Sequence, residues 1–472
     1  MAQDSRGNVK EQELQNKLNE ETGKGKTEVS DIGEELEIIF TETNRYYNVS
    51  KNGTIDGPYK IVRDEYPGDI TKNENGDELD GSEDNPYEIW CIEDLIEWSQ
   101  NYSNYLNSFI KLGRTLNFKS NLSYVDGKKL NCNSVEELKK LLTDSSGIGF
   151  TPINSFGGTF NGQGYEIQNI YINSQNENVG FIAGVEKNKN LNIKNFGITG
   201  TIIGIKNVGG ILGNAGSIAG TEYNTTISNC YNEANIYNYN TYTGVTLNGV
   251  GGIVGYLLDG NLTIENCYNK GNIYSASELN TLNYSGVGGI LGKVHFGDEI
   301  VINNCYNEGT IEGNGCRAGG IAGVGCLIVN SYNLGKIING AGITGYAGTV
   351  INCFNSGETV NGIYGTNYAT TITIKNVYTT ATTSAFPIVN LTNSACTYDI
   401  ANAFYSENCS QSDTRGTKIS EALMKSDGSN DTAEEKALLT LLNEFVDEYN
   451  NSENEIKLKS WKLEENGYPT FI

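Results

Sequence analysis

The chain has 472 residues, a formal net charge of −24 and a single histidine, His295. The acidic balance argues against nucleic acid as a partner, because its recognition needs a basic face. One histidine leaves no Ser-His-Asp or Cys-His arrangement and no multi-histidine metal site. The sequence therefore predicts no cofactor, no metal and no catalytic residue, and we expect His295 to be an exposed turn residue.

No segment reaches the roughly 18 apolar residues of a membrane span, and no apolar signal-peptide core follows Met1. The sequence leaves open whether a leader was trimmed or the protein is cytoplasmic. The 57 glycines beside six prolines are typical of a turn-rich β architecture.

Residues 1–63 are expected to form a small α+β module. Residues 1–25 are compatible with a helix, because Leu14 and Leu18 share one helical face. Strand-like segments follow at 36–40 and 46–49 and end in a Lys-Asn-Gly-Thr turn.

An acidic linker is expected at 64–86. Its run at 73–77, Asn-Glu-Asn-Gly-Asp, is similar to a calcium loop, but the spacing of its glycine and carboxylates does not match the EF-hand pattern. We therefore expect a solvated linker, and calcium binding by residues 73–84 is left open.

Residues 87–156 are expected to be an N-terminal cap. A strand and an amphipathic helix are predicted at 87–106, with Ile92, Leu95 and Trp98 on the apolar face of the helix. An open β edge invites association with other chains, so a stack of repeats needs its first coil covered.

A recurring tetrapeptide dominates residues 157–380 and indicates a stacked repeat, because self-similarity at 20–50 residues is the signature of a solenoid. It reads Asn-Cys-Tyr-Asn three times and then degrades. Its copies start at Asn229, Asn266, Asn304, Asn330, Asn352 and Asn376. An interleaved Gly-Gly-Ile phrase, once Ala-Gly-Ile, ends at Ile211, Ile253, Ile290, Ile321 and Ile343.

The length between phrases varies while the phrases persist. Successive glycine pairs are 42, 37, 31 and 22 residues apart, so the minimal coil has about 22 residues and earlier coils carry insertions at 238–248 and 275–285. These insertions fall at one point of the repeat, so we expect them to emerge on one side of the solenoid.

The two phrases predict a mainly β fold, a parallel β-helix whose coils stack about 4.8 Å apart. Equivalent residues then form ladders, with isoleucines inside and the Gly-Gly phrase at a corner of positive φ or tight backbone approach. The expected structural ladder contains Asn229, Asn266, Asn304, Asn330, Asn352, Cys230, Cys267, Cys305 and Cys353.

Two sets of aromatic residues are candidates for binding. The asparagines are interpreted as amides bonded along the axis, whereas the tyrosines are interpreted either as structural or as a carbohydrate-binding or adhesive stripe. The candidate binding stripe is Tyr231, Tyr268, Tyr306, Tyr332 and Phe354. The candidate binding loops carry Tyr239, Tyr242, Tyr274 and Tyr284.

Ten cysteines would suggest disulfides in a secreted protein. The four ladder cysteines share a repeat position that also accepts Ser331, which favours buried free thiols. On proximity alone, the better disulfide candidates are Cys316 with Cys326 and Cys396 with Cys409.

Residues 381–472 are expected to form a C-terminal cap with helices. Helices are predicted at 418–426 and 433–449, because apolar residues recur at helical spacing. A last strand at 458–463 and a Gly-Tyr-Pro-Thr-Phe segment close the chain.

The repeats resemble the GLUG-motif repeats, in which Gly-Gly-Ile-x-Gly alternates with Asn-Cys-Tyr-Asn-x-Gly. Matching stretches are 208–213, 250–255, 287–292 and 318–323. The resemblance implies a right-handed parallel β-helix on bacterial surface or secreted proteins, often adhesins. Some relatives are IgA-directed metallopeptidases, but the sequence has no His-Glu-x-x-His motif, so proteolysis is not carried over.

Residues 10–55 resemble the module that follows the membrane helix in pilin-like exported proteins of Gram-positive bacteria. The matching residues are Leu-Gln-x-x-Leu at 14–18 and Phe-Thr-Glu-Thr at 40–43. The resemblance implies attachment to the cell envelope through an anchor upstream of residue 1.

The sequence thus predicts a non-enzymatic extracellular or cell-surface protein. As an adhesin does, it would bind a host or environmental glycan or protein ligand through the solenoid face and inserted loops. The alternative is a polysaccharide-active β-helix enzyme, a lyase or glycosidase, which needs clustered carboxylates or a carboxylate with Arg or Lys. Asp298 and Glu299 beside His295 form the only local cluster of this kind.

Overall fold

The computed structural model describes most of the chain from residue 27 onward, with residues 27–62 described by their backbone alone. The residues outside the description are 1–26, 33–34, 41–44, 51–59, 63–68, 74–76, 91, 119–148, 217–222, 241–247, 278–284, 298, 315, 347, 366–370, 382–385 and 391–395. The expected N-terminal helix with Leu14 and Leu18 lies outside the described residues, as do Tyr242, Tyr284 and Asp298.

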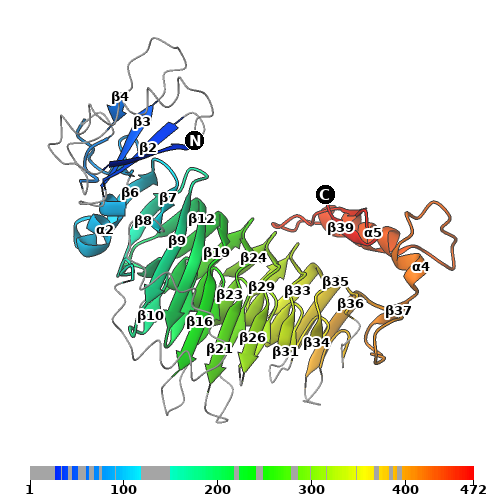
Figure 1. Cartoon of the computed structure of the whole chain (residues 1–472). Helices are drawn as coiled ribbons and strands as arrows, with labels where there is room; N and C mark the ends of the chain where they lie inside the picture. The colour runs from blue at the N-terminus through cyan, green and yellow to red at the C-terminus, as the bar shows by residue number, and fades with distance from the viewer. Residues whose placement is uncertain are drawn as a thin grey trace, which may run out of the picture.

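A four-stranded antiparallel sheet precedes the repeats (Figure 1). Its strands follow one another in chain order, and the predicted strand-like segments at 36–40 and 46–49 fall in the second and third. The strands are β1 Thr27–Ile32, β2 Glu35–Phe40, β3 Arg45–Ser50 and β4 Lys60–Val62.

The repeats form a parallel β-helix, as predicted: strands of successive coils pair in parallel along one axis, and Figure 1 shows them as a long row. One coil runs through β19 Asn261–Glu265, a corner at Asn266, β20 Tyr268–Asn269, β21 Ile273–Ser277, β22 Gly286–Gly288 and β23 Leu291–Val294. The alternating pattern places Leu262 and Ile264 inside, fully buried, and Thr263 and Glu265 outside.

Strands of the same type stack into columns. The columns that lead to and follow the asparagine corner contain β5 Tyr87–Ile89, β6 Asn107–Leu112, β7 Leu116–Asn117, β8 Gly157–Asn161, β9 Glu166–Asn173, β12 Leu191–Gly204, β15 Asn224–Asn232, β24 Ile300–Asn303, β25 Tyr306–Asn307, β29 Leu327–Val329, β30 Tyr332–Asn333, β33 Thr349–Asn355, β35 Thr371–Thr379 and β36 Thr397–Ser406.

The other faces of the coil are built in the same way. Their strands are β10 Asn178–Val179, β11 Ile182–Gly184, β13 Asn207–Gly209, β14 Leu212–Asn214, β16 Asn235–Asn240, β17 Gly249–Gly251, β18 Val254–Leu257, β26 Ile311–Asn314, β27 Arg317–Gly319, β28 Ala322–Val324, β31 Ile337–Ala341, β32 Thr344–Tyr346 and β34 Thr359–Asn361.

The parallel stack is longer than the predicted 157–380. On the N-terminal side β5 pairs in parallel with β6, and β6 with β8, so the stack already begins inside the segment expected to be a cap. On the C-terminal side β35 pairs with β36, and β36 with β37 Thr417–Ile419. Both flanks lack the two repeat phrases, so sequence self-similarity ends before strand stacking does.

The corner of the coil is formed by asparagine rather than by the Gly-Gly phrase. The first asparagine of each tetrapeptide has a φ of 51–55°, a left-handed conformation that asparagine tolerates because its short side chain bonds locally. The glycine pairs are absent from the residues with positive φ, so the expected positive-φ corner at Gly-Gly is wrong and the alternative, a tight backbone approach, holds.

The last asparagine of the tetrapeptide forms a second, fully buried ladder that the sequence interpretation missed. In Asn232, Asn269, Asn307 and Asn333 the side-chain Nδ2 donates to the Oδ1 of the next coil at 2.8 Å and to a main-chain carbonyl two residues on at 2.9 Å. The last member, Asn355, accepts from Asn333 and donates to the Gly357 carbonyl at 3.1 Å and to Thr379 Oγ1 at 3.3 Å. We call it the inner asparagine ladder, and it contains Asn232, Asn269, Asn307, Asn333 and Asn355.

The inner asparagine ladder explains why the Gly-Gly phrase must be glycine. A Cβ on Gly252 would lie 2.0 Å from the carbonyl oxygen of Gly289 and 2.5 Å from Oδ1 of Asn269. The same collision recurs at Gly289, where Asn307 takes the place of Asn269. The two repeat phrases are therefore linked by one contact, in which the glycine pair of one phrase packs against the last asparagine of the other.

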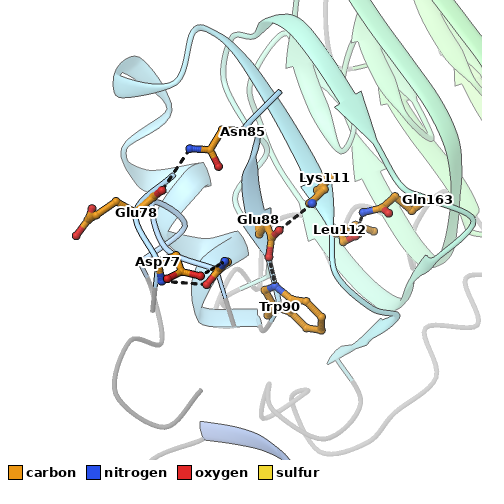
Figure 2. A network of polar contacts seen from close by, with 9 residues as sticks. Asp77, Glu78, Asn85, Glu88, Trp90, Lys111, Leu112 and Gln163 are labelled. Carbon is orange, nitrogen blue, oxygen red and sulfur yellow. Dashed lines mark hydrogen bonds and ion pairs between the residues drawn. The ribbon is translucent and has the colours of Figure 1, made fainter. Parts of the chain in front are cut away.

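The N-terminal end of the solenoid is closed by the helix α2 Ile92–Gln100, followed by the 3₁₀ turn η1 Tyr102–Asn104. Trp98 is fully buried and its ring lies 5.0 Å from that of Phe156 and 5.4 Å from that of Phe160. Figure 2 shows a polar network nearby: Glu88 accepts from Trp90 Nε1 at 2.6 Å and pairs with Lys111 at 2.8 Å.

The C-terminal segment turns back along the side of the solenoid (Figure 1). Its elements are α4 Glu421–Met424, α5 Leu438–Asn450 and the antiparallel pair β38 Trp461–Leu463 and β39 Pro469–Phe471. A separate apolar cluster joins them to the outer surface of β33, β35 and β36, including Phe354, Tyr378 and Phe404. The segment is thus a lateral cover as much as an end cap.

We predict that the inner asparagine ladder is needed for stability. In Asn307→Asp, a fully buried carboxylate loses the donors to Asn333 Oδ1 and Gly309 O, so the free energy of unfolding should fall by roughly 3–5 kcal/mol. The control, Asn304→Asp, changes the partly exposed corner of the same coil and should cost less than about 1 kcal/mol. Equal losses in chemical denaturation would contradict the prediction.

Candidate binding surface

The candidate binding stripe forms one continuous ring stack. Neighbouring ring centroids lie 4.7–5.1 Å apart and neighbouring planes are nearly parallel, from Tyr231 through Tyr268, Tyr306, Tyr332 and Phe354 to Tyr378. Each ring face is therefore occupied by the next coil. The stripe presents ring edges and hydroxyl groups outward, which is unlike a carbohydrate platform that offers a ring face.

The corner asparagines run beside the stripe as an outer asparagine ladder. Nδ2 of Asn229 donates to Asn195 at 3.1 Å, Asn352 to Asn330 at 2.8 Å and Asn376 to Asn352 at 2.7 Å. Asn304 donates to Asn266. Asn330 departs from the series, because its Nδ2 donates to Asn303 at 2.8 Å instead.

The C-terminal segment covers the later coils of both ladders. Main-chain carbonyls of Lys457 and Lys459 accept from Asn330 at 3.1 Å and Asn352 at 3.0 Å, and the Lys459 amide donates to Asn330 Oδ1 at 2.9 Å. Trp461 donates through Nε1 to Asn352 Oδ1 at 2.7 Å. Here the chain binds its own polypeptide with the outer asparagine ladder.

The aromatic residues of the segment contact the stripe from its edge. The Phe471 ring lies 6.2 Å from Tyr332 and 5.8 Å from Phe354, and the Trp461 ring lies 5.8 Å from Phe354 and 5.7 Å from Tyr378, all in tilted geometry. Phe354 is 4% exposed, and burial raises the pKa of Tyr332 to about 12. Tyr332 and Phe354 are therefore not free for an external ligand, contrary to the sequence expectation.

No described residue covers the earlier coils of the two ladders. We call them the uncovered stripe: Tyr231, Tyr268 and Tyr306 with Asn229, Asn266 and Asn304. Asn229 and Asn266 are exposed, whereas Asn330 and Asn352 in the covered coils are 2% and 0% exposed.

Charged groups surround the uncovered stripe. The Tyr231 hydroxyl donates to Glu166, and Lys270 Nζ lies 5.1 Å from the Tyr268 ring centroid. Burial, with the charges of Glu233, Glu166 and Glu308, raises the pKa of Tyr268. The surface is therefore polar and acidic beside the ring edges.

The candidate binding loops are not assembled as predicted. Tyr239 is 4% exposed and packs with Ile203, because it lies in strand β16 instead of in the insertion. Tyr274 lies partly buried in β21, paired with Tyr237 of β16 and Glu312 of β26. The loop residues Tyr242 and Tyr284 are outside the described part of the chain.

The ladder cysteines are buried free thiols in the structure. Cys230, Cys267, Cys305 and Cys353 each place Sγ 3.1–3.3 Å from the carbonyl two residues earlier. Burial raises the pKa of Cys353 to about 12.

The two proposed disulfides do not form: Cys316, Cys326, Cys396 and Cys409 are all thiols outside any disulfide. Cys316 lies beside Ser275 in the neighbouring coil, and the Cys409 thiol contacts the carbonyl of Ala381. The proximity of two cysteines in the sequence therefore did not predict a disulfide in the folded stack.

A cationic group lies on another face of the coil. Lys293, in β23, is 4% exposed and pairs across the sheet with Tyr256 and Val324. Burial, with Arg317 nearby, lowers its pKa to about 8. His295 is partly buried near Tyr256, instead of fully exposed, and burial lowers its pKa.

The expected catalytic cluster is not assembled in the described residues, since Glu299 is exposed and Asp298 is not described. Among described residues, no group of three or more His, Cys, Asp or Glu is placed to hold a metal ion. In the expected linker, Asn73 Nδ2 donates to Asp77 Oδ2 at 2.9 Å. Within the described part of the chain, no helix combines the length and apolarity needed to cross a membrane.

Comparisons with known proteins give a structural similarity. No family model and no characterised protein matches the sequence. A Bacteroides ovatus protein provisionally named an immunoglobulin A1 protease has a TM-score of 0.37 and 18% identity, over 84% of this chain and 94% of that one. A structure named IgA1 Protease has a TM-score of 0.35 and 17% identity, over 84% of this chain and 27% of that one.

These neighbours correct one expectation. The prediction that the chain is not an enzyme is withdrawn, because both similar structures are named as proteases. At these TM-scores and identities the names describe those two proteins, and no residue of this chain takes a proteolytic role from them.

We predict that Lys293 destabilises the fold below pH 8. Its pKa is about 8 in the folded chain against 10.5 ordinarily. Between these two pH values the unfolded chain therefore binds more protons than the folded chain, and the free energy of unfolding rises with pH. Lys293→Met should be more stable than wild type at pH 7, by roughly 1–3 kcal/mol, with the difference vanishing near pH 10.5. A pH-independent difference in denaturation midpoints would argue against this assignment.

Proposed function

We propose that this chain is an extracellular or cell-surface β-helix protein that binds a macromolecular ligand along the side of its solenoid, as an adhesin does. The observation that carries the proposal is the uncovered stripe. It repeats the same ring edge and the same amide in three successive coils, at positions where the later coils already hold polypeptide.

Regular repetition suits an extended ligand. Each coil offers one tyrosine edge and one asparagine amide at the strand spacing of about 4.8 Å, so a ligand lying along the axis meets the same groups several times. Tyrosine gives a large contact area at low entropic cost. The resemblance to GLUG-motif arrays and to the pilin-like module supports a surface location with an N-terminal attachment to the cell envelope.

The proposal predicts that binding to host surfaces depends on the uncovered stripe. Tyr268→Ser removes the central ring edge and should reduce binding of the purified chain to host cells and matrix proteins about tenfold. The control, Phe296→Ser, removes an aromatic that is 52% exposed on another part of the surface. Cell-binding cytometry of both variants, after thermal unfolding has verified their folding, checks the result; equal binding by all three proteins would sink the proposal.

A polysaccharide-active enzyme is a second candidate, and one observation favours it. Lys293 has a pKa of about 8, within the range in which a buried lysine acts as a general base, and Arg317 lies nearby with its guanidinium 3.4 Å from the Tyr346 ring centroid. This pair would suit an anionic sugar chain.

The enzymatic candidate makes a separate prediction. Product release from a panel of uronate-containing polysaccharides should occur with wild type and Lys270→Met, an exposed-lysine control, and fall at least about a hundredfold with Lys293→Met. Absence of any product from wild type, measured by chromatography, would eliminate this candidate.

A further inference from the structure

The C-terminal segment shows what the side face of the solenoid recognises. It is a polypeptide held in two ways: its main-chain carbonyls accept from the second N–H of Asn330 and Asn352, and its aromatic side chains meet the edges of the ring stack. The corner asparagine and the ring that make these contacts recur in register in the earlier coils.

The uncovered stripe has the same asparagines and rings, but the residue that precedes each corner asparagine is different. In the covered coils the residue before the corner asparagine is apolar and buried, Val329 or Ile351. In the uncovered coils the same register position holds Ser228, Glu265 and Asn303. The expected occupant therefore has polar side chains on that flank, where the chain's own segment packs apolar ones.

The charged residues around the uncovered stripe indicate the charge of the ligand that it binds. Among the described residues, four carboxylates lie around the uncovered stripe against two lysines, one of which is already paired with Glu308 at 3.5 Å. The carboxylates are Glu166, Glu233, Glu265 and Glu308, and the lysines are Lys194 and Lys270. Excess negative charge beside a polypeptide-binding face favours a basic partner.

We propose that the uncovered stripe is a docking surface for an extended, basic polypeptide segment of a partner protein. The segment lies along the solenoid axis, with its carbonyls on the asparagine amides, its aromatic side chains against the tyrosine edges and its lysines or arginines on the carboxylates. This inference rests on the proposed function and names its ligand class: a protein segment, rather than a glycan, because the ring faces that a sugar would stack on are occupied by neighbouring coils.

The test uses the full chain and two synthetic peptides. The probe is a fluorescent peptide of residues 456–472, which carries Trp461, Phe471 and three lysines, and its control replaces Lys457, Lys459 and Lys462 by glutamate. The lysine peptide should bind, at least about tenfold more tightly than the control, and its affinity should fall as salt is raised from about 50 to about 500 mM. Equal affinities would overturn the basic-partner assignment.

The position of binding is checked first on the wild-type chain and then on two variants. A photoreactive group in place of the probe's tryptophan should cross-link to residues 228–233, 265–270 or 303–308, and Tyr268→Ser should lower the yield while Phe296→Ser keeps it. Cross-links confined to 329–333 or 351–355 would mean exchange with the chain's own segment and would overturn the proposal. Sedimentation should show that the chain is a monomer. A dimer whose cross-links join residues 456–472 of one copy to the uncovered stripe of another would overturn the proposal, because the occupant would then be a second copy of this chain.

The outcomes separate this inference from the proposed function. If the chain binds host surfaces through Tyr268 but no peptide binds, or a neutral glycan displaces the probe, the polypeptide assignment fails and the proposed function stands. If the peptide binds at the stripe and the chain binds no host surface, the docking surface stands and the proposed function fails.

Discussion

The inner asparagine ladder is the contact on which the rest of the solenoid depends. Each amide is fully buried and donates both along the axis and to the backbone of its own turn, so a missing partner would leave a buried polar group unpaired at a cost of several kcal/mol. The ladder also determines which residues can face it, because the glycine pair of the facing strand has no room for a Cβ. One constraint thus explains both repeat phrases.

The outer face divides into two parts with different uses. From Tyr332 onward, the chain covers its own ring edges and corner amides with the C-terminal segment, and the flanking residues change from polar to apolar at that point. Before Tyr332 the same ladders continue with no described residue covering them, and carboxylates flank them. The contacts between the C-terminal segment and the later coils show which groups this face can satisfy, and the earlier coils repeat those groups in register.

Ring stacking changes what the aromatic stripe can recognise. A row of tyrosines in a sequence is open to interpretation as a carbohydrate platform, but coils about 4.8 Å apart press each ring face against the next. The binding properties then come from edges, hydroxyls and adjacent amides. The buried Lys293 lies on another face and, with its pKa lowered to about 8, is chemically distinct from this surface.

The parallel stack, the register of its ladders and the interior isoleucines follow from the amino-acid pattern alone, because identical residues at fixed repeat positions must meet when coils stack. The sequence also placed β38 and much of α5 through ordinary apolar periodicity. Tertiary structure decided where Tyr332 and Tyr239 lie, one beneath the C-terminal segment and the other within a strand. No local pattern shows that residues 457–471 return to Asn330 and Asn352, because that contact joins positions more than a hundred residues apart whose match in shape and hydrogen bonding exists only once both are folded.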